Sequence, residues 1–371
     1  MPSAVEWLIM LWNVKTNDET TDLKPVTLRT PAQLAAAGLI GADDLQKISE
    51  VASTFDIAIS PQMQTLIDAD DPADPIAAQF VPRDAELSCL PEELEDPIGD
   101  HAHTPTPGIV HRYPDRVLLK PVHACAVYCR FCFRREMLGS GAEALDEDSL
   151  ELALDYIDSQ AGIWEVILTG GDPLIMSPRR IVRIMRRLES IGHVGVVRFH
   201  TRVPVVAPDL IDDSLIGALR IKKATFGVLH TNHVRELSSD ARQACAKLVD
   251  AGIPMLSQTV LLNGVNADAQ SLQALFRALV EMRIKPYYLH HGDLARGTRH
   301  FRTSIAAGQE LMRSLRGHVS GLCQPHYVLD IPGGHGKVPI GPQYLTELND
   351  ANYAVCDYRG NSHHYRDSVG L

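Results

Sequence analysis

The sequence predicts an α/β fold built around a parallel sheet. From about residue 115 onward, short apolar runs alternate with amphipathic helical stretches, as in consecutive βαβ units. In chain order the apolar runs are RVLLKPV, WEVILTGG, VGVVRFHT, KATFGVLH, PMLSQTVLLNGV, IKPYYLHH and HYVLDIPGG. Helical stretches lie between them, such as SPRRIVRIMRRLESIG and SSDARQACAKLVDAG, and each ends near a glycine.

Glycines and polar residues stand at or just after the ends of these apolar runs. They are Gly170, Gly171, Asp172, His200, His230, Asp293 and Asp330. The carboxyl ends of parallel strands meet at one rim, and in α/β barrels this rim carries the chemistry. We therefore expect the functional site at that rim.

The first hundred residues are predicted to form a helical segment without a catalytic motif. Helical patterns appear at residues 30–39 and 42–55. The second pattern has apolar residues at a spacing close to 3.6, and these are Leu45, Ile48, Val51 and Phe55.

Composition argues against a nucleic-acid-binding or membrane protein. Of the 371 residues, 45% are hydrophobic and 22% are charged, which provides for a sizeable core. The formal net charge of −11 argues against a nucleic-acid surface, and no apolar stretch approaches the length of a membrane span. The start of the chain fits a secretory signal poorly. The seven cysteines show no disulfide pattern, so we expect a protein of the reducing cytoplasm.

Three cysteines within HACAVYCRFCFRR form the most informative local motif. Cys125, Cys129 and Cys132 have the spacing C-x3-C-x2-C. A structural zinc would need a remote fourth ligand, because such sites usually have four. Three thiolates close together suit a four-iron cluster that leaves one iron without a protein ligand. The cluster is the favoured interpretation, and a closed zinc site or unrelated thiols are the alternatives.

The stretch TGGDP follows an apolar run and is a weaker signal by itself. Glycines at a strand end allow the backbone to approach a ligand closely, and Asp172 can accept a hydrogen bond from an ammonium. Gly-Gly-Asp is also a common turn, so both interpretations remain open from the residues alone.

A second glycine-rich stretch, DIPGGHGKVPIGP, contains Lys337. It is not a phosphate-binding loop, because Ile331 and Val338 stand where that motif requires Gly and Ser or Thr. A positioned lysine amine can bind a carbonyl as a Schiff base, including the aldehyde of pyridoxal 5′-phosphate (PLP). The local sequence equally permits an exposed lysine in a turn.

The cysteine motif resembles that of the radical S-adenosylmethionine (SAM) superfamily, and the longer match resembles the lysine 2,3-aminomutase family. Besides the cysteine motif, the stretches that carry the resemblance are HRYPDRVLLKP, TGGDPL, SQTVLLNGVN, YYLHHGDLARGTRHFRT and GLCQPHYVLDIPGGHGKVPI. The resemblance implies a partial (β/α)6 TIM-type barrel of the radical SAM type. We expect a helical N-terminal segment at 1–100, the barrel with a PLP site at 101–345, and a C-terminal tail at 346–371.

The resemblance also implies three cofactors: a [4Fe-4S] cluster, SAM and PLP. The three motif cysteines would hold the cluster, whose fourth iron would bind SAM and deliver the electron that splits it into methionine and a 5′-deoxyadenosyl radical. Four further residues would bind SAM, and these are Gly170, Gly171, Asp172 and Gln258.

By the same resemblance, Lys337 would bind the PLP aldehyde. Arg112 and Arg116, with Tyr113 between them, would hold the phosphate, and guanidinium groups suit phosphate well. The alternative for the two arginines is a solvated basic pair.

The substrate that the resemblance favours is L-lysine. Arg134 would pair with the substrate carboxylate, and Asp293 and Asp330 would receive the side-chain ammonium. A buried ammonium needs negative charge to offset its desolvation, whereas two acids would repel the side chain of glutamate. Each aspartate alone could instead be a helix or turn cap. The implied enzyme is an isomerase that moves the amino group of L-lysine from C2 to C3 and gives β-lysine.

Several alternatives stay open at this stage. The same chemistry could provide β-lysine for the modification of elongation factor P, or act on another amino acid. A non-catalytic zinc-binding protein is the alternative of a different class. Some family members carry a cysteine-rich C-terminal extension that binds zinc. The late part of this sequence has one cysteine, Cys356, so we do not expect that zinc site. His335 stands within the lysine loop, where it could tighten the loop or contact the cofactor, although a lone histidine is more often an incidental polar residue.

The expected partners are small molecules and proteins rather than nucleic acid or membrane. They are an amino acid substrate, a one-electron donor such as flavodoxin or ferredoxin, and further copies of the chain in a homo-oligomer.

Overall fold

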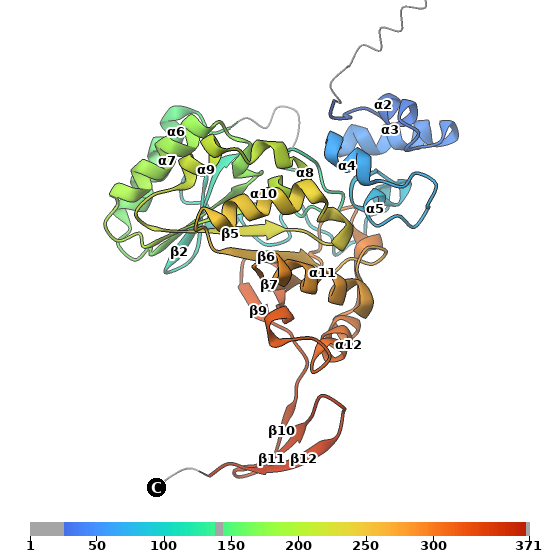
Figure 1. Cartoon of the computed structure of the whole chain (residues 1–371), viewed down its shortest axis with the longest axis vertical. Coiled ribbons are helices and arrows are strands. Elements are labelled where there is room, and N and C mark those ends of the chain that lie inside the picture. The colour runs from blue at the N-terminus through green and yellow to red at the C-terminus, as the bar shows by residue number, and fades with distance from the viewer. Residues whose placement is uncertain (1–25, 138–143, 369–371) are drawn as a thin grey trace, which may run out of the picture.

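The computed structural model describes residues 26–137 and 144–368, and its centre is a nine-stranded sheet with the strand order β1 to β9 (Figure 1). Neighbouring strands from β2 to β8 are parallel, and an antiparallel strand lies at each edge. The strands are β1 (Ile109–Tyr113), β2 (Arg116–Val122), β3 (Glu165–Gly170), β4 (Val196–Thr201), β5 (Ala224–His230), β6 (Met255–Val260), β7 (Ile284–His290), β8 (His326–Ile331) and β9 (Gly336–Pro339).

A helix follows each of the strands from β2 to β7. These helices are α6 (Glu147–Ser159), α7 (Pro178–Ser190), α9 (Asp213–Leu219), α10 (Ser239–Asp250), α11 (Ala269–Glu281) and α12 (Ile305–Leu315). The predicted partial barrel of six strand–helix units is therefore confirmed, and β8 adds a parallel strand beyond them. Short elements connect the units, and these are η4 (Pro173–Ile175), α8 (Val203–Val206), η5 (Pro208–Leu210), η6 (Val234–Glu236), η7 (Arg299–Phe301) and η8 (Gly321–Cys323).

The barrel helices begin where the sequence supplies a capping side chain. Ser177 accepts a hydrogen bond from a backbone amide in the first turn of α7, and Ser238 and Asp268 do the same for α10 and α11. The buried residues of α7 recur every three or four positions, and they are Ile181, Ile184, Met185 and Leu188. Within the described ranges, none of the helices combines the length and the apolar character that crossing a membrane requires.

The two edge strands of the sheet, β1 and β9, are not paired by a ladder of backbone hydrogen bonds among the described strands. Contacts that involve side chains join them instead. The backbone amide of Lys337 on β9 donates to the hydroxyl of Tyr113 on β1 at 2.7 Å. His103 donates through Nε2 to the carbonyl of Gly334 at 3.0 Å. A Cβ on Gly99 would lie 2.3 Å from the backbone nitrogen of Gly334, so a side chain at this position would separate the two segments. We call this junction of β1 and β9 the seam.

The N-terminal segment consists of short helices, as predicted, and packs into the same apolar core as the barrel. Thr30 caps α2, and within α3 Ile48 and Val51 are buried as their spacing predicts, as is Phe55 directly after it. Leu45 differs from the expectation, because it starts the helix and is 37% exposed. The elements are α2 (Pro31–Ala36), η1 (Ala42–Asp44), α3 (Leu45–Thr54), α4 (Pro61–Leu66), α5 (Ala77–Phe80), η2 (Asp84–Leu87) and η3 (His101–His103). The first 25 residues of the predicted segment lie outside the described residues.

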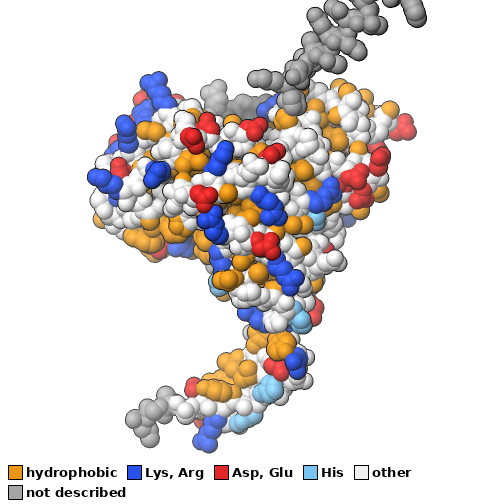
Figure 2. Space-filling view, in the orientation of Figure 1, with side chains coloured by type: hydrophobic (Ala, Val, Ile, Leu, Met, Phe, Trp, Pro, Cys, Tyr) orange, Lys and Arg blue, Asp and Glu red, His pale blue; other side chains and the backbone are white. Residues whose placement is uncertain are grey.

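The C-terminal tail forms a separate antiparallel sheet, which extends away from the barrel (Figure 1). Its strands are β10 (Leu345–Asn349), β11 (Asn352–Cys356) and β12 (Ser362–Arg366). Figure 2 shows hydrophobic side chains along this projection. Four of them are about half exposed, and these are Leu345, Leu348, Tyr358 and Tyr365.

A buried ion cluster attaches the N-terminal segment to the cysteine loop. Glu86 of η2 accepts from Arg130 at 2.6 Å and from Arg135, and the side chains of all three are nearly inaccessible. Burial alone would raise the pKa of Glu86, but the two guanidinium groups hold it below its usual value. Glu86 is thus the carboxylate that pairs with both arginines.

Glu86→Gln is expected to lower the free energy of unfolding by about 3–5 kcal/mol, because it leaves two buried guanidinium groups without a counter-charge. Urea unfolding followed by circular dichroism measures the change. The matched control is Asp84→Asn, since Asp84 pairs with Lys47 at 3.4 Å while both side chains are about 60% exposed. This exposed pair contributes about 1 kcal/mol or less. An equal effect of the two substitutions would contradict the assignment.

Candidate active site

A cavity of about 910 Å³ opens among the parallel strands, a size that accommodates small organic ligands. Its lining includes residues at the carboxyl ends of the strands and also Arg116 and Glu165 at the amino ends of β2 and β3. All of the site residues predicted from the sequence line it. They are Arg112, Tyr113, Arg116, Cys125, Cys129, Cys132, Arg134, Gly170, Gly171, Asp172, Gln258, Asp293, Asp330 and Lys337. The structure therefore brings them together at one place, whereas the role of each residue stays a prediction.

The three motif cysteines lie on the loop after β2 and are free thiols. Burial raises the pKa of all three, and nearby cysteines raise those of Cys125 and Cys132 further, that of Cys132 to about 11. All three cysteines line the same cavity. In a four-iron cluster each thiolate binds a different iron, so three such thiols beside a cavity fit a cluster with one iron facing the cavity.

The TGGDP stretch packs directly against the cysteine loop. Gly170 has φ +104°, and a Cβ on Gly171 would lie 2.1 Å from the carbonyl oxygen of Ala124. The amides of Gly171 and Asp172 donate to Val122 and Ala124 at 2.7 and 2.9 Å. Glycine is thus required here for β3 to approach the cysteine loop.

Asp172 connects the end of β3 to the end of β4. One carboxylate oxygen accepts from Thr201 at 2.7 Å and from the amide of Leu174 at 3.0 Å. The other accepts from the amides of Arg202 and Val203 at 2.6 and 3.1 Å. Burial raises the pKa of Asp172, while these hydrogen bonds favour the ionised form. The carboxylate therefore has a structural function that the sequence did not reveal, and its contact with SAM stays a prediction.

A cluster of three cations surrounds Asp100, which the sequence analysis did not single out. Arg134 donates to one carboxylate oxygen through Nε at 3.1 Å and through Nη2 at 2.9 Å. Arg112 lies 3.2 Å from the other oxygen, and Lys120 lies 3.9 Å from the carboxylate. Burial would raise the pKa of Asp100, but Arg134 and Lys120 lower it. One anion against three cations leaves an excess of positive charge, which suits anionic groups such as phosphate and carboxylate.

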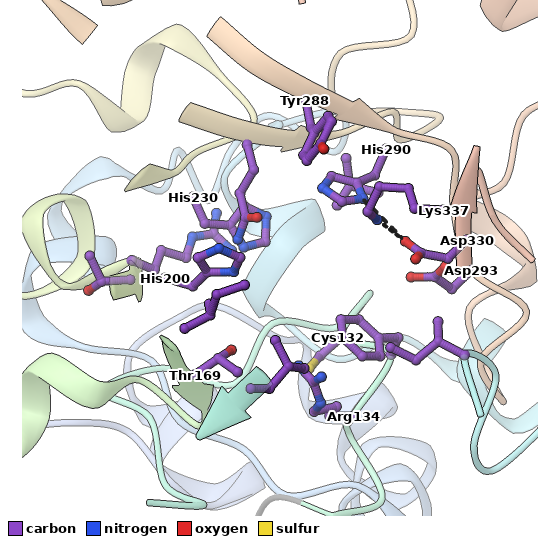
Figure 3. A pocket seen from close by; sticks show the side chains of 18 of the residues that line it. Cys132, Arg134, Thr169, His200, His230, Tyr288, His290, Asp293, Asp330 and Lys337 are labelled. Atoms are coloured by element: carbon purple, nitrogen blue, oxygen red, sulfur yellow. Dashed lines mark hydrogen bonds and ion pairs between the residues drawn. The ribbon is translucent and has the colours of Figure 1, made fainter. Parts of the chain in front are cut away.

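The opposite wall of the cavity carries the acids and the predicted PLP lysine (Figure 3). Lys337 forms an ion pair with Asp330, and its Nζ lies 3.3 Å from Nδ1 of His290. Burial and the charge of Asp330 raise the pKa of Asp293 to about 7. Figure 3 shows Cys132 and Arg134 across the cavity from these residues, so the cavity has a cationic and an acidic side.

The residues predicted to hold PLP lie on both sides of the seam. Tyr113 contacts the backbone of Lys337, and the guanidinium of Arg116 lies 3.8 Å from the centre of the Tyr113 ring. Arg112 donates to the carbonyl of Ile98 at 2.6 Å. An amine and two guanidinium groups that line the same cavity fit an aldehyde that carries a phosphate.

Further polar side chains line the cavity without a predicted role. His200 and His230 were placed at the rim by the sequence, and in each of them Nε2 is buried without a hydrogen-bond partner in the described structure. Burial lowers the pKa of both well below the usual value, so both imidazoles are neutral near pH 7. Arg198 pairs with Glu165 at 3.0 Å. His200, His230 and Arg198 belong to no local sequence motif that would have indicated a specific role.

Comparisons with known proteins agree with this geometry. The model of the radical SAM superfamily matches residues 119–275, and that of the lysine-2,3-aminomutase family matches residues 312–368. The L-lysine 2,3-aminomutase of Acetoanaerobium sticklandii is 37% identical, over 96% of this chain and 84% of the relative. That of Clostridium subterminale is 35% identical over the same shares. A glutamate 2,3-aminomutase of Clostridioides difficile is 38% identical, over 81% of this chain and 71% of the relative.

Replacing any one of Cys125, Cys129 and Cys132 by alanine is expected to prevent stable cluster assembly. After anaerobic reconstitution the wild-type chain should hold about four irons and four sulfides, and each variant should hold far fewer, because a cluster ligand is missing. Iron and sulfide analysis with absorption spectroscopy measures this. Cys89→Ser is the control, since Cys89 is exposed and is not among the residues that line the cavity. Wild-type iron content in the alanine variants would exclude these residues as the ligands.

Proposed function

Because the chain belongs to the lysine 2,3-aminomutase family of radical SAM enzymes, we propose that it moves the amino group of L-lysine from C2 to C3 and releases β-lysine. Family membership makes the protein an isomerase that uses a [4Fe-4S] cluster and SAM. The choice of lysine is our inference. It depends on one observation, the pair of acids Asp293 and Asp330 on the cavity wall opposite Arg134.

The charge pattern of the cavity supports lysine as the substrate. Lysine has a carboxylate at one end and an ammonium at the other, which matches a cavity with Arg134 on one side and two aspartates on the other. A second carboxylate, as in glutamate, would face Asp293 and Asp330 and be repelled. Because the relatives include a glutamate 2,3-aminomutase, family membership alone does not select the substrate.

The cationic side of the cavity, formed by Arg112, Lys120 and Arg134 around Asp100, can bind the substrate carboxylate as well as a phosphate. Arg134 directs Nε and Nη2 at Asp100, while Arg112 shares the same acid. The remaining guanidinium nitrogens stay available as donors, since each guanidinium has five N–H groups. Asp100 thus orients Arg134 and leaves part of its hydrogen-bonding capacity for a ligand.

We further propose PLP as the third cofactor, bound to Lys337 through its aldehyde and to Arg112, Tyr113 and Arg116 through its phosphate. When bound, the cluster supplies one electron to SAM, and PLP holds the migrating nitrogen in a conjugated system. The backbone of Gly170 and Gly171 would approach SAM closely.

Other residues would orient the ligands. Gln258 on β6 would donate to SAM from the facing wall. The substrate ammonium would replace Lys337 as the partner of Asp330. We also propose that an external one-electron donor reduces the cluster and that the chain assembles into a homo-oligomer.

Lys337→Ala is expected to abolish PLP binding while the cluster is retained. Borohydride reduction of the PLP-loaded wild-type protein should attach the cofactor covalently to Lys337, which peptide mass spectrometry detects. The matched control is Lys222→Ala, which removes an exposed lysine and should leave labelling unchanged. Covalent labelling of another lysine in the wild type would disprove the assignment.

The reconstituted enzyme is expected to convert lysine and not glutamate, and Asp293→Asn should lower kcat/KM for lysine about 100-fold. The reason is that losing one partner of a buried charge pair costs about 3 kcal/mol. Product analysis by mass spectrometry, with SAM and dithionite supplied, measures both. Turnover of glutamate in preference to lysine would refute the substrate assignment.

The pKa of Asp293 adds a pH signature to this experiment. The groups that act on it are Asp330, which raises its pKa, and Lys337 and Arg134, which lower it. With a pKa of about 7, Asp293 is protonated at lower pH and then cannot neutralise an ammonium. The kcat/KM for lysine should therefore fall as the pH drops from 8 to 6, and Asp293→Asn should remove most of this fall.

A further inference from the structure

Arg202, directly after β4, is in contact with one of the three motif cysteines. Its side chain is 5% exposed and borders the cavity. Nη1 donates a hydrogen bond to Sγ of Cys129 at 2.8 Å. Cys129 is therefore a thiol that a permanently charged group contacts directly.

The guanidinium of Arg202 is held in place by other buried groups. Nη2 donates to Gln79 of α5 at 2.6 Å and to Glu236 of η6 at 2.7 Å. The rings of Phe80 and Phe131 lie 4.6 and 5.5 Å from its central carbon. An arginine fixed in this way loses little conformational freedom when it contacts a sulfur, and it cannot turn away to solvent.

Glu236 is fixed as firmly as the arginine it pairs with. One of its oxygens accepts from the amides of Asn232 and His233, both at 2.9 Å, and from Gln79 at 3.0 Å. Glu236 and Gln79 are completely buried. The pair Arg202–Glu236 thus places a positive charge at the sulfur and a negative charge behind it.

We propose that Arg202 is a positioning residue that sets the reduction potential of the cluster through Cys129, and that Glu236 limits its effect. The proposal rests on the proposed function, in which the motif cysteines hold a [4Fe-4S] cluster. On reduction the cluster gains one electron, changes from the 2+ to the 1+ state and becomes more negative. A donor and a positive charge at a ligand sulfur stabilise the more negative state, and an acid behind them opposes this.

Removing the positive charge of the pair and removing its negative charge should shift the midpoint potential of the cluster in opposite directions. Two residues with a merely structural role would not give opposite shifts. Arg202→Gln removes the positive charge and should shift the midpoint potential of the cluster to a more negative value. Glu236→Gln removes the opposing charge and should shift it to a more positive value. The double variant should lie between the two single variants.

The experiment is a redox titration of the reconstituted full-length protein, with dithionite as the reductant and electron paramagnetic resonance of the reduced cluster as the readout. Iron and sulfide analysis verifies cluster content in every variant. The control is Arg198→Gln, since Arg198 is also on β4 and lines the same cavity but pairs with Glu165. Its midpoint potential should stay at the wild-type value.

The possible outcomes separate this inference from the proposed function. A wild-type protein that assembles no cluster would refute the proposed function itself. A cluster whose potential is unchanged in both variants, or moves in the same direction in both, would overturn the role of Arg202. If Arg202→Gln does not retain the cluster, the test rests on Glu236→Gln. A midpoint potential of Glu236→Gln that is not more positive than that of the wild type would also overturn the proposal.

Discussion

Buried charge pairs between the N-terminal segment and the barrel are the constraint on which the cavity depends. The loop that carries the cysteines also carries Arg130, Arg134 and Arg135, whose charges must be neutralised where water is excluded. Glu86 and Asp100, both from the segment before the barrel, supply the opposing charge. The N-terminal segment is therefore a part of the site rather than an addition to it.

The same principle explains why the cavity has two electrostatic sides. On one side Asp100 is shared by three cations. On the other, Lys337 pairs with Asp330, and the pKa of Asp293 is raised to about 7, so this carboxyl is only partly ionised near pH 7. Each side is thus partly neutralised without a ligand. A zwitterionic amino acid with a cationic side chain would complete both sides at once, which supports the proposed preference for lysine.

Periodicity and strand-end residues predicted the parallel α/β sheet and its functional rim, and the resemblance to the family implied the partial barrel. The apolar runs became β2 to β8, and residues far apart in the chain, such as Cys125 and Lys337, line one cavity because parallel strands end at one rim. The pairs that orient the site could not be predicted. Glu86 is one acid in an acidic stretch, and its partner Arg130 is 44 positions away. Arg202 likewise has its partners on α5 and η6, which only the tertiary fold brings together.

The seam has a consequence for the order in which the molecule is completed. Tyr113 and Lys337 are 224 positions apart and His103 and Gly334 are 231 apart, so the seam joins distant segments of the chain for the gain of a few hydrogen bonds. Elements of the barrel that are neighbours in the chain can form before this closure. If PLP is bound by Arg112 on one edge and by Lys337 on the other, as we propose, its binding would add contacts across the seam and stabilise the closed barrel.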